Sequence, residues 1–322
     1  MEEELVKRAG IPFQTIPAAG LHGVGPRALP HNAVTLLRGF QAAMKILREF
    51  KPDVLFFTGG YVAAPMAFAG RKIPTLLVVP DIEPGLALKS LARFADVITV
   101  TAPDSQKYFS KKVTVTGYPL RAELTTWNRQ KARAALNLDD NLPVVLVFGG
   151  SKGARSINEA MISQLPTLLE LTQIVHVTGQ LDWEAVQTAR AGLNSGQRNR
   201  YHVFPYLHEE MGAALASADL VISRAGASTL GEFPFFGLPA ILVPYPHAWR
   251  YQKVNADYLA ERGAAVIVKD KMLKNDLLPV IKELLADPAK REAMSQAMKS
   301  LSHPQAAHAI AEQIMQLGGQ LS

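Results

Sequence analysis

The chain has 322 residues, 48% hydrophobic and 19% charged, and its 34 Lys and Arg against 28 Asp and Glu give a formal net charge of +6. This length favours two domains, because one hydrophobic core rarely grows beyond about 250 residues. The composition excludes disordered, collagen-like and coiled-coil chains. No apolar run reaches the ~18 residues that cross a bilayer, and the acidic start Met1 to Glu4 is unlike a signal peptide, so we expect a cytoplasmic protein.

The sequence contains no cysteine, which agrees with a reducing compartment and excludes disulfides, thiolate nucleophiles and Cys-ligated zinc. The excess of basic residues permits an anionic partner such as a nucleotide or a phospholipid surface. We expect no nucleic-acid partner, because no basic cluster is interleaved with aromatic residues.

The N-terminal region opens with a helix-like segment, Glu2 to Ala9, where a doubly wound domain usually has a strand and a glycine-rich turn. We therefore expect the first strand–helix unit of such a domain to be missing. Gly20 to Gly25 is glycine-rich, but no strand precedes it and we interpret it as a loop. Ala33 to Phe50 carries apolar side chains at i, i+3, i+4 and i+7 spacing and predicts an amphipathic helix.

Short apolar runs that alternate with helical patterns predict ten strands. These runs are apolar on both faces, as in strands of a parallel sheet buried between helix layers, so the predicted class is α/β. The runs are Val54 to Phe57, Thr75 to Val79, Val97 to Val100, Val113 to Val115, Val144 to Phe148, Ile174 to Val177, His202 to Phe204, Leu220 to Ser223, Ala240 to Val243 and Ala265 to Val268.

The polar stretch from Leu120 to Asn141 marks the expected boundary between two doubly wound domains. We place an N-terminal domain at 1–122, a linker at 123–137 and a C-terminal domain at 138–302. The last helical pattern, within 303–322, could pack on either domain.

The strongest local motif is the buried strand Val144 to Phe148 followed by Gly149-Gly150-Ser151-Lys152-Gly153 and a helix start. Glycines let the backbone approach an anion, and the free N–H groups at a helix N-terminus favour phosphate. The motif is neither a P-loop nor a complete G-x-G-x-x-G, so a tight turn that binds nothing is the alternative.

A second strand–turn–helix motif is Leu220 to Glu232. Ser228 or Thr229 can cap the helix or contact a phosphate, and Glu232 can accept hydrogen bonds from the two hydroxyls of a ribose. The alternative is a capping box around Ser228 and Gly231 or Glu232.

A third group, Ile241 to His247 with Gln252 and Asn255, contains a lone histidine, which is more often structural than a ligand. No H-E-x-x-H or Asp-x-Asp motif occurs, so we expect no metal site and no cofactor.

Several of these motifs together resemble the MurG family of inverting glycosyltransferases, in order along nearly the whole chain. The segments that carry the resemblance are Gly59 to Val62, Pro84 to Leu86, Ala92 to Asp96, Thr116 to Arg121, Gly149 to Arg155 and Ser223 to Thr229. It implies the GT-B architecture, with two Rossmann-like domains facing across a cleft. It also implies transfer of N-acetylglucosamine from UDP-GlcNAc to undecaprenyl-pyrophosphoryl-muramyl-pentapeptide, which converts lipid I to lipid II in peptidoglycan synthesis.

The resemblance also implies roles for individual residues in donor binding. Gly150 and Ser151 would touch the diphosphate, and Arg121 would reach the donor from the domain junction. Leu207 would hold the uracil through its backbone, and Gln252 would contact the sugar hydroxyls. The second motif would supply a phosphate-facing helix start and a ribose-binding carboxylate, from Ala227, Ser228, Thr229 and Glu232.

This sequence departs from the family pattern on the acceptor side. The N-terminal glycine-rich loop, which carries a candidate general base in the family, has no counterpart, and Val78 to Asp81 replaces a His-Glu-Gln-Asn segment. Tyr251 replaces the first glutamine of a pair. Asp81 is the polar group that remains, and it is our candidate base, with a helix cap or an ion pair as the alternative.

Family members act at the inner face of the cell membrane, so we expect a peripheral association with anionic lipid. In the helix Ala33 to Phe50, basic residues flank an apolar face that could sit on headgroups, although core helices show similar stripes. The apolar residues are Leu36, Leu37, Phe40, Met44 and Leu47, and the basic ones Arg27, Arg38, Lys45 and Arg48. Alternative functions are a UDP-sugar transferase with another lipid or metabolite acceptor, and a catalytically impaired UDP-sugar-binding module.

Overall fold

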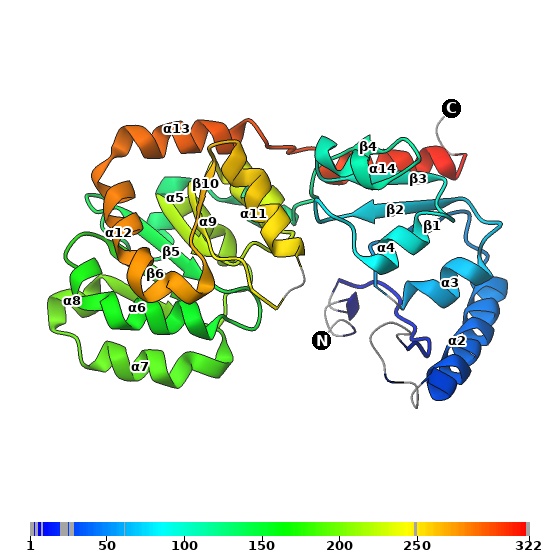
Figure 1. Ribbon diagram of the computed structural model, residues 1–322, viewed down its shortest axis with the longest axis horizontal. Helices are drawn as coiled ribbons and strands as arrows, with labels where there is room; N and C mark the ends of the chain where they lie inside the picture. Colours follow the sequence, from blue (N-terminus) through cyan, green and yellow to red (C-terminus); the bar gives the residue numbers. More distant parts are fainter. Residues whose placement is uncertain are drawn as a thin grey trace.

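The computed structural model describes residues 3, 6–7, 9–19, 25, 29–60, 62–247 and 250–319. It consists of two α/β lobes that lie side by side (Figure 1). Of the glycine-rich loop predicted at Gly20 to Gly25, only Gly25 is among the described residues, and Arg27 also lies outside them. Among the described residues, no helix combines the length and the apolar character that a membrane crossing requires.

The N-terminal lobe is built on a four-stranded parallel sheet of order β1-β2-β3-β4. Its strands are β1 (Leu55–Phe57), β2 (Thr75–Val79), β3 (Val97–Val100) and β4 (Thr114–Val115). The connecting helices are α2 (Leu29–Phe50), α3 (Ala63–Ala69), α4 (Leu86–Leu91) and the 3-10 helix η1 (Pro103–Tyr108).

The C-terminal lobe contains a six-stranded parallel sheet of order β10-β9-β8-β5-β6-β7. Its strands are β5 (Val144–Phe148), β6 (Gln173–Val177), β7 (Tyr201–Phe204), β8 (Leu220–Ser223), β9 (Ala240–Leu242) and β10 (Ala265–Ile267). The helices between and after them include α6 (Arg155–Leu168), α7 (Trp183–Ala191), α8 (Ser195–Asn199), α9 (Met211–Ser217), α10 (Thr229–Phe236), α11 (Tyr251–Glu261), α12 (Leu273–Ala286) and α13 (Pro288–Lys299), with 3-10 turns η3 (Gln180–Asp182) and η4 (Asp270–Met272).

Each of the ten predicted strands is present, with ends that differ by at most one residue from those expected. The apolar runs predicted them well because β5, for example, is buried along its whole length. Alternate residues of β5 enter different clusters, with Leu146 packing on one face and Val147 on the other. Helices cover both faces of the sheet, as a doubly wound fold requires.

Segment 123–137, which we expected as a linker, contains most of the 3-10 helix η2 (Ala122–Thr126) and the helix α5 (Arg129–Ala135). Asn128 caps α5 by accepting a 2.9 Å hydrogen bond from the backbone of Lys131. Arg133 is 3% exposed and pairs with Asp219 at 2.9 Å. The segment therefore contributes to the core of the C-terminal lobe.

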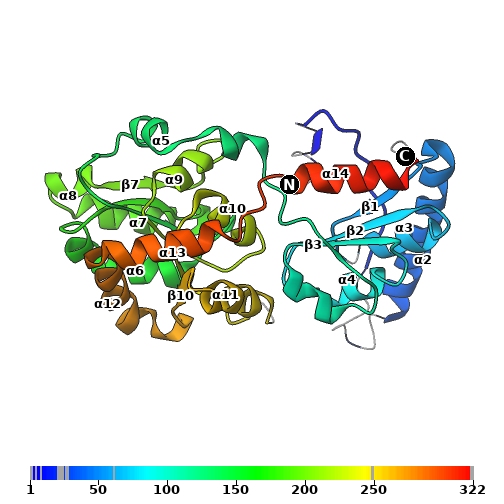
Figure 2. The same cartoon turned by 90° about the horizontal axis from the view of Figure 1, so that it is seen from above.

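The last helix, α14 (Ala306–Leu317), lies across the sheet of the N-terminal lobe, to which the chain returns after α13 (Figures 1 and 2). Ile310 packs with Leu76 and Val78 of β2 in a small buried cluster. The sequence left the position of this helix open, and the structure assigns it to the N-terminal lobe because it covers an apolar sheet face.

Candidate functional site

The two glycine-containing turns meet at the point where the strand order of the C-terminal sheet reverses. Strands β5 and β8 are neighbours, and their register pairs Phe148 with Ser223 at the carboxyl ends. The turns that begin at Gly149 and Arg224 therefore leave the same edge of the sheet side by side. Ligands of open α/β sheets bind at such a switch point.

The turn after β5 needs its glycines for two different reasons. Gly150 and Gly153 have φ of 89° and 78°, which residues with a Cβ rarely adopt. A Cβ on Gly149 would collide with Ala154, and one on Gly153 with the carbonyl of Thr178, whereas one on Gly150 would meet nothing within 4 Å. The open side of Gly150 is where a ligand can approach the backbone.

The helix α6 that follows has no side-chain cap at Ala154. Its first N–H groups are therefore available to an anion, which the partial positive charge of the helix N-terminus also favours.

The turn after β8 leads into α10, where Ser228 is the N-cap residue. Ser228 has helical dihedral angles and makes no capping hydrogen bond, so the capping-box alternative is wrong. The hydroxyl of Thr229 donates a 2.6 Å hydrogen bond to the carbonyl of Gly226 and shapes the turn.

Glu232, in the first turn of α10, is 8% exposed. Its burial raises the pKa of the carboxyl, while the charge of Arg121 and a hydrogen bond with Ser228 lower it. The two residues proposed for the donor, Glu232 and Arg121, are therefore electrostatically coupled, although they come from different parts of the chain.

A buried arginine links the two turns. The guanidinium of Arg224 donates to the carboxylate of Asp270 and, at 2.8 Å, to the hydroxyl of Ser156 in α6. The Ser156 hydroxyl in turn donates to the same Asp270 oxygen at 2.7 Å. This arrangement, which we call the Arg224 clamp, fixes α6 relative to the β8 turn. No sequence motif indicated it, because its three members lie far apart along the chain.

A cavity of about 940 Å³ opens in front of these turns, within the range of small-molecule sites. It is lined by the residues from Gly149 to Ser156, by Glu159, Leu181 and Asp182, and by Arg224, Tyr245, Pro246, His247, Gln252 and Asp270. Lys152 brings positive charge to it, and Arg155 pairs with Asp182 in the same wall at 3.1 Å. Gln252 accepts a 2.8 Å hydrogen bond from the backbone N–H of Tyr245, which orients its side chain in the wall.

The structure divides the predicted donor residues into two groups. Gly150, Ser151 and Gln252 line the cavity. The second group, Arg121 and Glu232, lies near Tyr118. Burial and the charges of Glu232 and Asp81 raise the pKa of Tyr118, and the charge of Arg121 lowers it. Ala227 and Ser228 are half-buried in the turn between the groups.

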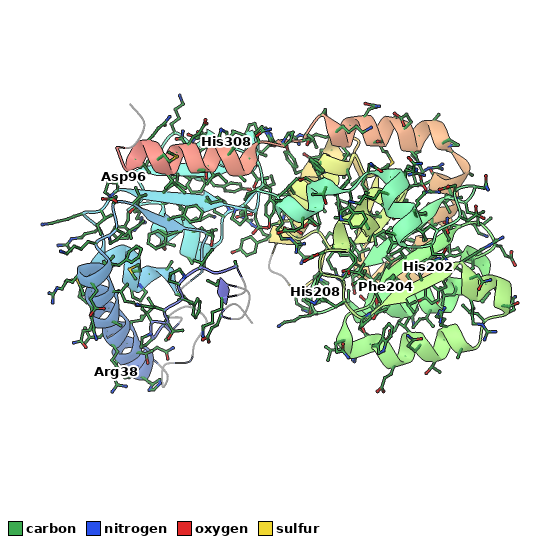
Figure 3. The ribbon with its side chains drawn as sticks, turned by 180° about the vertical axis from the view of Figure 1, so that it is seen from behind. Arg38, Asp96, His202, Phe204, His208 and His308 are labelled. Atoms are coloured by element: carbon green, nitrogen blue, oxygen red, sulfur yellow. The ribbon has the colours of Figure 1, made fainter. Side chains whose placement is uncertain are left out.

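Leu207 lies in the loop after β7, and its side chain is 8% exposed within the cluster that contains Phe148 and Phe233. The backbone contact of Leu207 with a ligand stays a prediction. The next residue, His208, lies on the side of the lobe that faces the other lobe (Figure 3).

Asp81, the candidate base, follows β2 and meets the C-terminal lobe. Its Oδ1 accepts a 2.8 Å hydrogen bond from the amide of Asn255. Burial raises the pKa of the Asp81 carboxyl, and this hydrogen bond lowers it. In the described part of the chain, no group of three or more His, Asp or Glu side chains is arranged to hold a metal ion.

These features define the class of protein. The protein has two α/β lobes, each built on a parallel sheet. Its C-terminal lobe has a switch point with two amide-rich turns, a buried carboxylate and a cation-bearing cavity. This combination is typical of a two-lobed protein that binds a nucleotide-linked ligand.

Comparisons with known proteins give the family. Residues 1–100 match the glycosyltransferase family 28 N-terminal domain, and residues 144–310 match its C-terminal domain. The UDP-N-acetylglucosamine–N-acetylmuramyl-(pentapeptide) pyrophosphoryl-undecaprenol N-acetylglucosamine transferase of Roseiflexus sp. is 40% identical over 97% of this chain and 80% of its own length. That of Desulforamulus reducens is 40% identical over 95% of this chain and 85% of its own length. The chain belongs to the MurG family of glycosyltransferases.

Solved structures agree with this assignment. MurG from Acinetobacter baumannii superposes with a TM-score of 0.74 at 28% identity, covering 98% of this chain and 88% of that one. CalG4, the calicheamicin glycosyltransferase, shares the fold at 15% identity, with a TM-score of 0.64 over 99% of this chain and 89% of its own. The GT-B architecture expected from the sequence is confirmed.

Proposed function

We propose that the protein transfers N-acetylglucosamine from UDP-GlcNAc to undecaprenyl-pyrophosphoryl N-acetylmuramyl-pentapeptide, with inversion at the anomeric carbon. The relatives that are 40% identical over almost the whole chain carry this activity in their names. The observation that carries the proposal is the placement of two helix starts without a side-chain cap, those of α6 and α10, at one switch point beside the buried Glu232.

The donor would lie across both groups of residues. The diphosphate would meet the N–H groups near Gly150, Ser151, Ala227 and Ser228, while the N–H of Thr229 donates to Gly226 and shapes the turn. The carboxylate of Glu232 would accept hydrogen bonds from the ribose. The uracil would contact the backbone of Leu207. Gln252, already oriented in the cavity wall, would bind hydroxyls of the sugar.

The reaction would be an in-line displacement. A hydroxyl of the acceptor attacks the anomeric carbon, the bond from that carbon to the diphosphate oxygen breaks, and UDP leaves. The helix N-termini and Arg121 stabilise the negative charge that develops on the leaving group. Asp81 is the candidate to accept the proton of the acceptor hydroxyl, because its raised pKa brings the carboxyl closer to that task.

An acceptor assay with radiolabelled UDP-GlcNAc tests this function. We expect label to move from UDP-GlcNAc to lipid I, and Asp81→Asn to lower kcat by more than about 100-fold if Asp81 is the base. A panel of other glycolipid and metabolite acceptors tests whether Val78 to Asp81, which replaces the family acceptor segment, changes the choice of acceptor. Transfer to another acceptor in place of lipid I would contradict the acceptor assignment, and tight UDP binding without any transfer would indicate a binding module.

A lipid-linked acceptor requires the protein to reach a membrane surface, and α2 with its neighbours offers a suitable face. Val34 and Leu37 are 50% and 58% exposed, and Phe68 of α3 is 50% exposed. Phe68 contacts Phe40 of α2, and Phe94 lies 6.5 Å from it. We define these five residues as the α2 apolar surface.

Basic side chains surround the α2 apolar surface. Arg71 lies over the ring of Phe68, and Arg38 extends from α2 away from the lobe (Figure 3). Other apolar residues of α2 face the interior, since Ala43 is fully buried and Leu47 of the predicted stripe packs on the core. We propose that the α2 apolar surface and these cations bind anionic headgroups.

A further inference from the structure

The side chain of Asn255 joins the two lobes at the donor site. Asn255 lies in α11 and is 0% exposed. Its Oδ1 accepts a 3.1 Å hydrogen bond from the backbone N–H of Ile82, and its Nδ2 donates to Asp81 at 2.8 Å and to the carbonyl of Ala225 at 3.1 Å. Both N–H donors of the amide are therefore used, one toward each lobe.

The three partners of Asn255 belong to segments that the reaction must align. Ala225 follows Arg224 of the clamp and precedes the phosphate-facing turn of α10. Asp81 ends the acceptor segment of the N-terminal lobe, and Ile82 follows it directly. One turn before Asn255 on the same helix, Gln252 holds the cavity wall through Tyr245. A single helix thus contacts the donor cavity, the β8 turn and the acceptor segment.

Other contacts hold the same segment against α11. The buried carboxylate of Glu83 pairs with Arg250 of the C-terminal lobe at 2.5 Å. The hydroxyl of Ser105 donates to the carbonyl of Ile82 at 2.8 Å from within the N-terminal lobe. The segment from Asp81 to Glu83 is therefore fixed from both sides, and Asn255 is its buried, fully hydrogen-bonded partner.

We propose that Asn255 is an interlobe positioning residue that holds the acceptor segment in register with the donor site. It touches neither substrate in this role; it sets the distance and angle between the groups that do. Displacement of reacting groups by about 1 Å can cost about 100-fold in rate. The proposed transfer reaction is needed only for the turnover measurement below, and the distance measurement is independent of it.

The distance measurement uses a swapped pair of side chains. The chain has no cysteine, so cysteines at the exposed positions Lys45 and Glu184, one in each lobe, give two spin labels for pulsed electron resonance in the full chain. We expect a narrow distance distribution in the parent and a broad or shifted one in Asn255→Asp, where two carboxylates face each other. Adding Asp81→Asn to this variant supplies a new N–H donor to the carboxylate introduced in α11. The hydrogen bond to the carbonyl of Ala225 is not replaced, so we expect the distribution to move back toward that of the parent.

The turnover measurement uses Asn255→Ala and a matched control. We expect Asn255→Ala to lower kcat by about 30-fold or more while the Kd for UDP, measured by calorimetry, changes less than about 3-fold. The control is Arg262→Ala, which removes an interlobe ion pair with Asp104 (2.8 Å) and leaves the hydrogen bonds of Asp81, Ile82 and Glu83 in place. We expect it to keep kcat within about 3-fold.

Distinct outcomes overturn the proposal. A parent-like distance distribution in Asn255→Asp, or no recovery in the swapped pair, shows that this contact does not set the lobe arrangement. Equal losses of kcat in Asn255→Ala and Arg262→Ala show that turnover depends on interlobe contacts in general and not on Asn255 in particular. Loss of UDP binding in a folded Asn255→Ala shows that the residue serves the donor turn alone. If the parent transfers no sugar to lipid I, the proposed function fails, and the distance measurement still decides the role of Asn255.

Discussion

Glu232 combines two properties at the residue scale, because a carboxylate that binds a ribose must be charged while its burial opposes the charge. Burial raises its pKa in the folded state. A raised carboxyl pKa means that folding favours the neutral form, so stability is lost as pH rises from the unfolded pKa through the folded one. At neutral pH the charged Glu232 therefore lowers the stability of the protein.

We expect Glu232→Gln to raise Tm at pH 7.5 by about 2 °C and to weaken UDP binding by about 10-fold or more. The amide keeps the volume and the contact with Ser228 but cannot accept both ribose hydroxyls as a carboxylate does. Thermal unfolding and calorimetric titration with UDP measure the two effects. A lower Tm together with unchanged UDP affinity would contradict this account of Glu232.

Arg224 has a structural task in the clamp, and its side chain is 9% exposed against 23% for Asp270. Removing one partner of such a pair leaves an uncompensated charge and costs about 3 kcal/mol, whereas removing both costs much less. We expect Arg224→Met to destabilise the protein by about this amount in urea unfolding, and the double variant Arg224→Met with Asp270→Asn to recover at least half of the loss. Equal losses in the single and double variants would show that the charge pairing is unimportant.

At the scale of elements, the proposed ligand binding at the turn between β5 and α6 depends on how closely the ligand can approach the backbone. Gly150 and Gly263 both have positive φ, and a Cβ at either meets nothing within 4 Å. Alanine at either position should therefore lower the stability of the protein by about 1 kcal/mol through backbone strain. Only at Gly150 does the added methyl group enter the cavity.

We expect Gly150→Ala to weaken UDP binding by about 10-fold and Gly263→Ala, at the end of α11, to leave it unchanged, with similar losses of stability in both. Calorimetry and urea unfolding of the two variants provide the comparison. If both variants bind UDP as the parent does, the diphosphate does not lie against this turn.

At the scale of the whole molecule, the α2 apolar surface belongs to the N-terminal lobe, and the cavity proposed for the donor is lined by residues of the C-terminal lobe. This separation would let one lobe rest on lipid while the other exchanges soluble nucleotide. The binding would combine apolar insertion with attraction to anionic headgroups, and salt would weaken the second contribution.

We expect the double variant Leu37→Asp with Phe68→Asp to lose at least 10-fold in binding to vesicles that contain anionic phospholipid. Leu171→Asp is the control, because Leu171 is 42% exposed on the C-terminal lobe and lies outside the α2 apolar surface. Co-sedimentation at low and high salt measures both. Equal binding by the two variants would place the lipid contact elsewhere.

The strand–turn–helix motifs of the proposed donor side could be predicted from the sequence because their signals are local. A buried strand followed by glycines and a helix start is written in consecutive residues, as at Val144 to Arg155, and the same holds for Leu220 to Glu232. The structure contains the predicted strands. It excludes the capping box at Ser228 that the sequence left open, because Ser228 has helical dihedral angles and makes no capping hydrogen bond.

The acceptor side and the lobe interface could not be predicted in this way. Asp81 and Asn255 are 174 residues apart, and Arg224 and Asp270 are 46 apart, so no spacing rule relates them. The sequence likewise left α14 without a lobe, since an amphipathic helix specifies that it has an apolar face and not which sheet receives it.

By itself, then, the sequence determined the strands, the α/β class, the two strand–turn–helix motifs and the family, because periodicity and turn chemistry act between near neighbours along the chain. Only the tertiary structure decided that the two turns are joined by the Arg224 clamp, that α14 covers the N-terminal sheet and that Asn255 connects the lobes. These contacts depend on how separate elements pack in space, where burial and hydrogen-bond geometry select partners that the order of residues does not reveal.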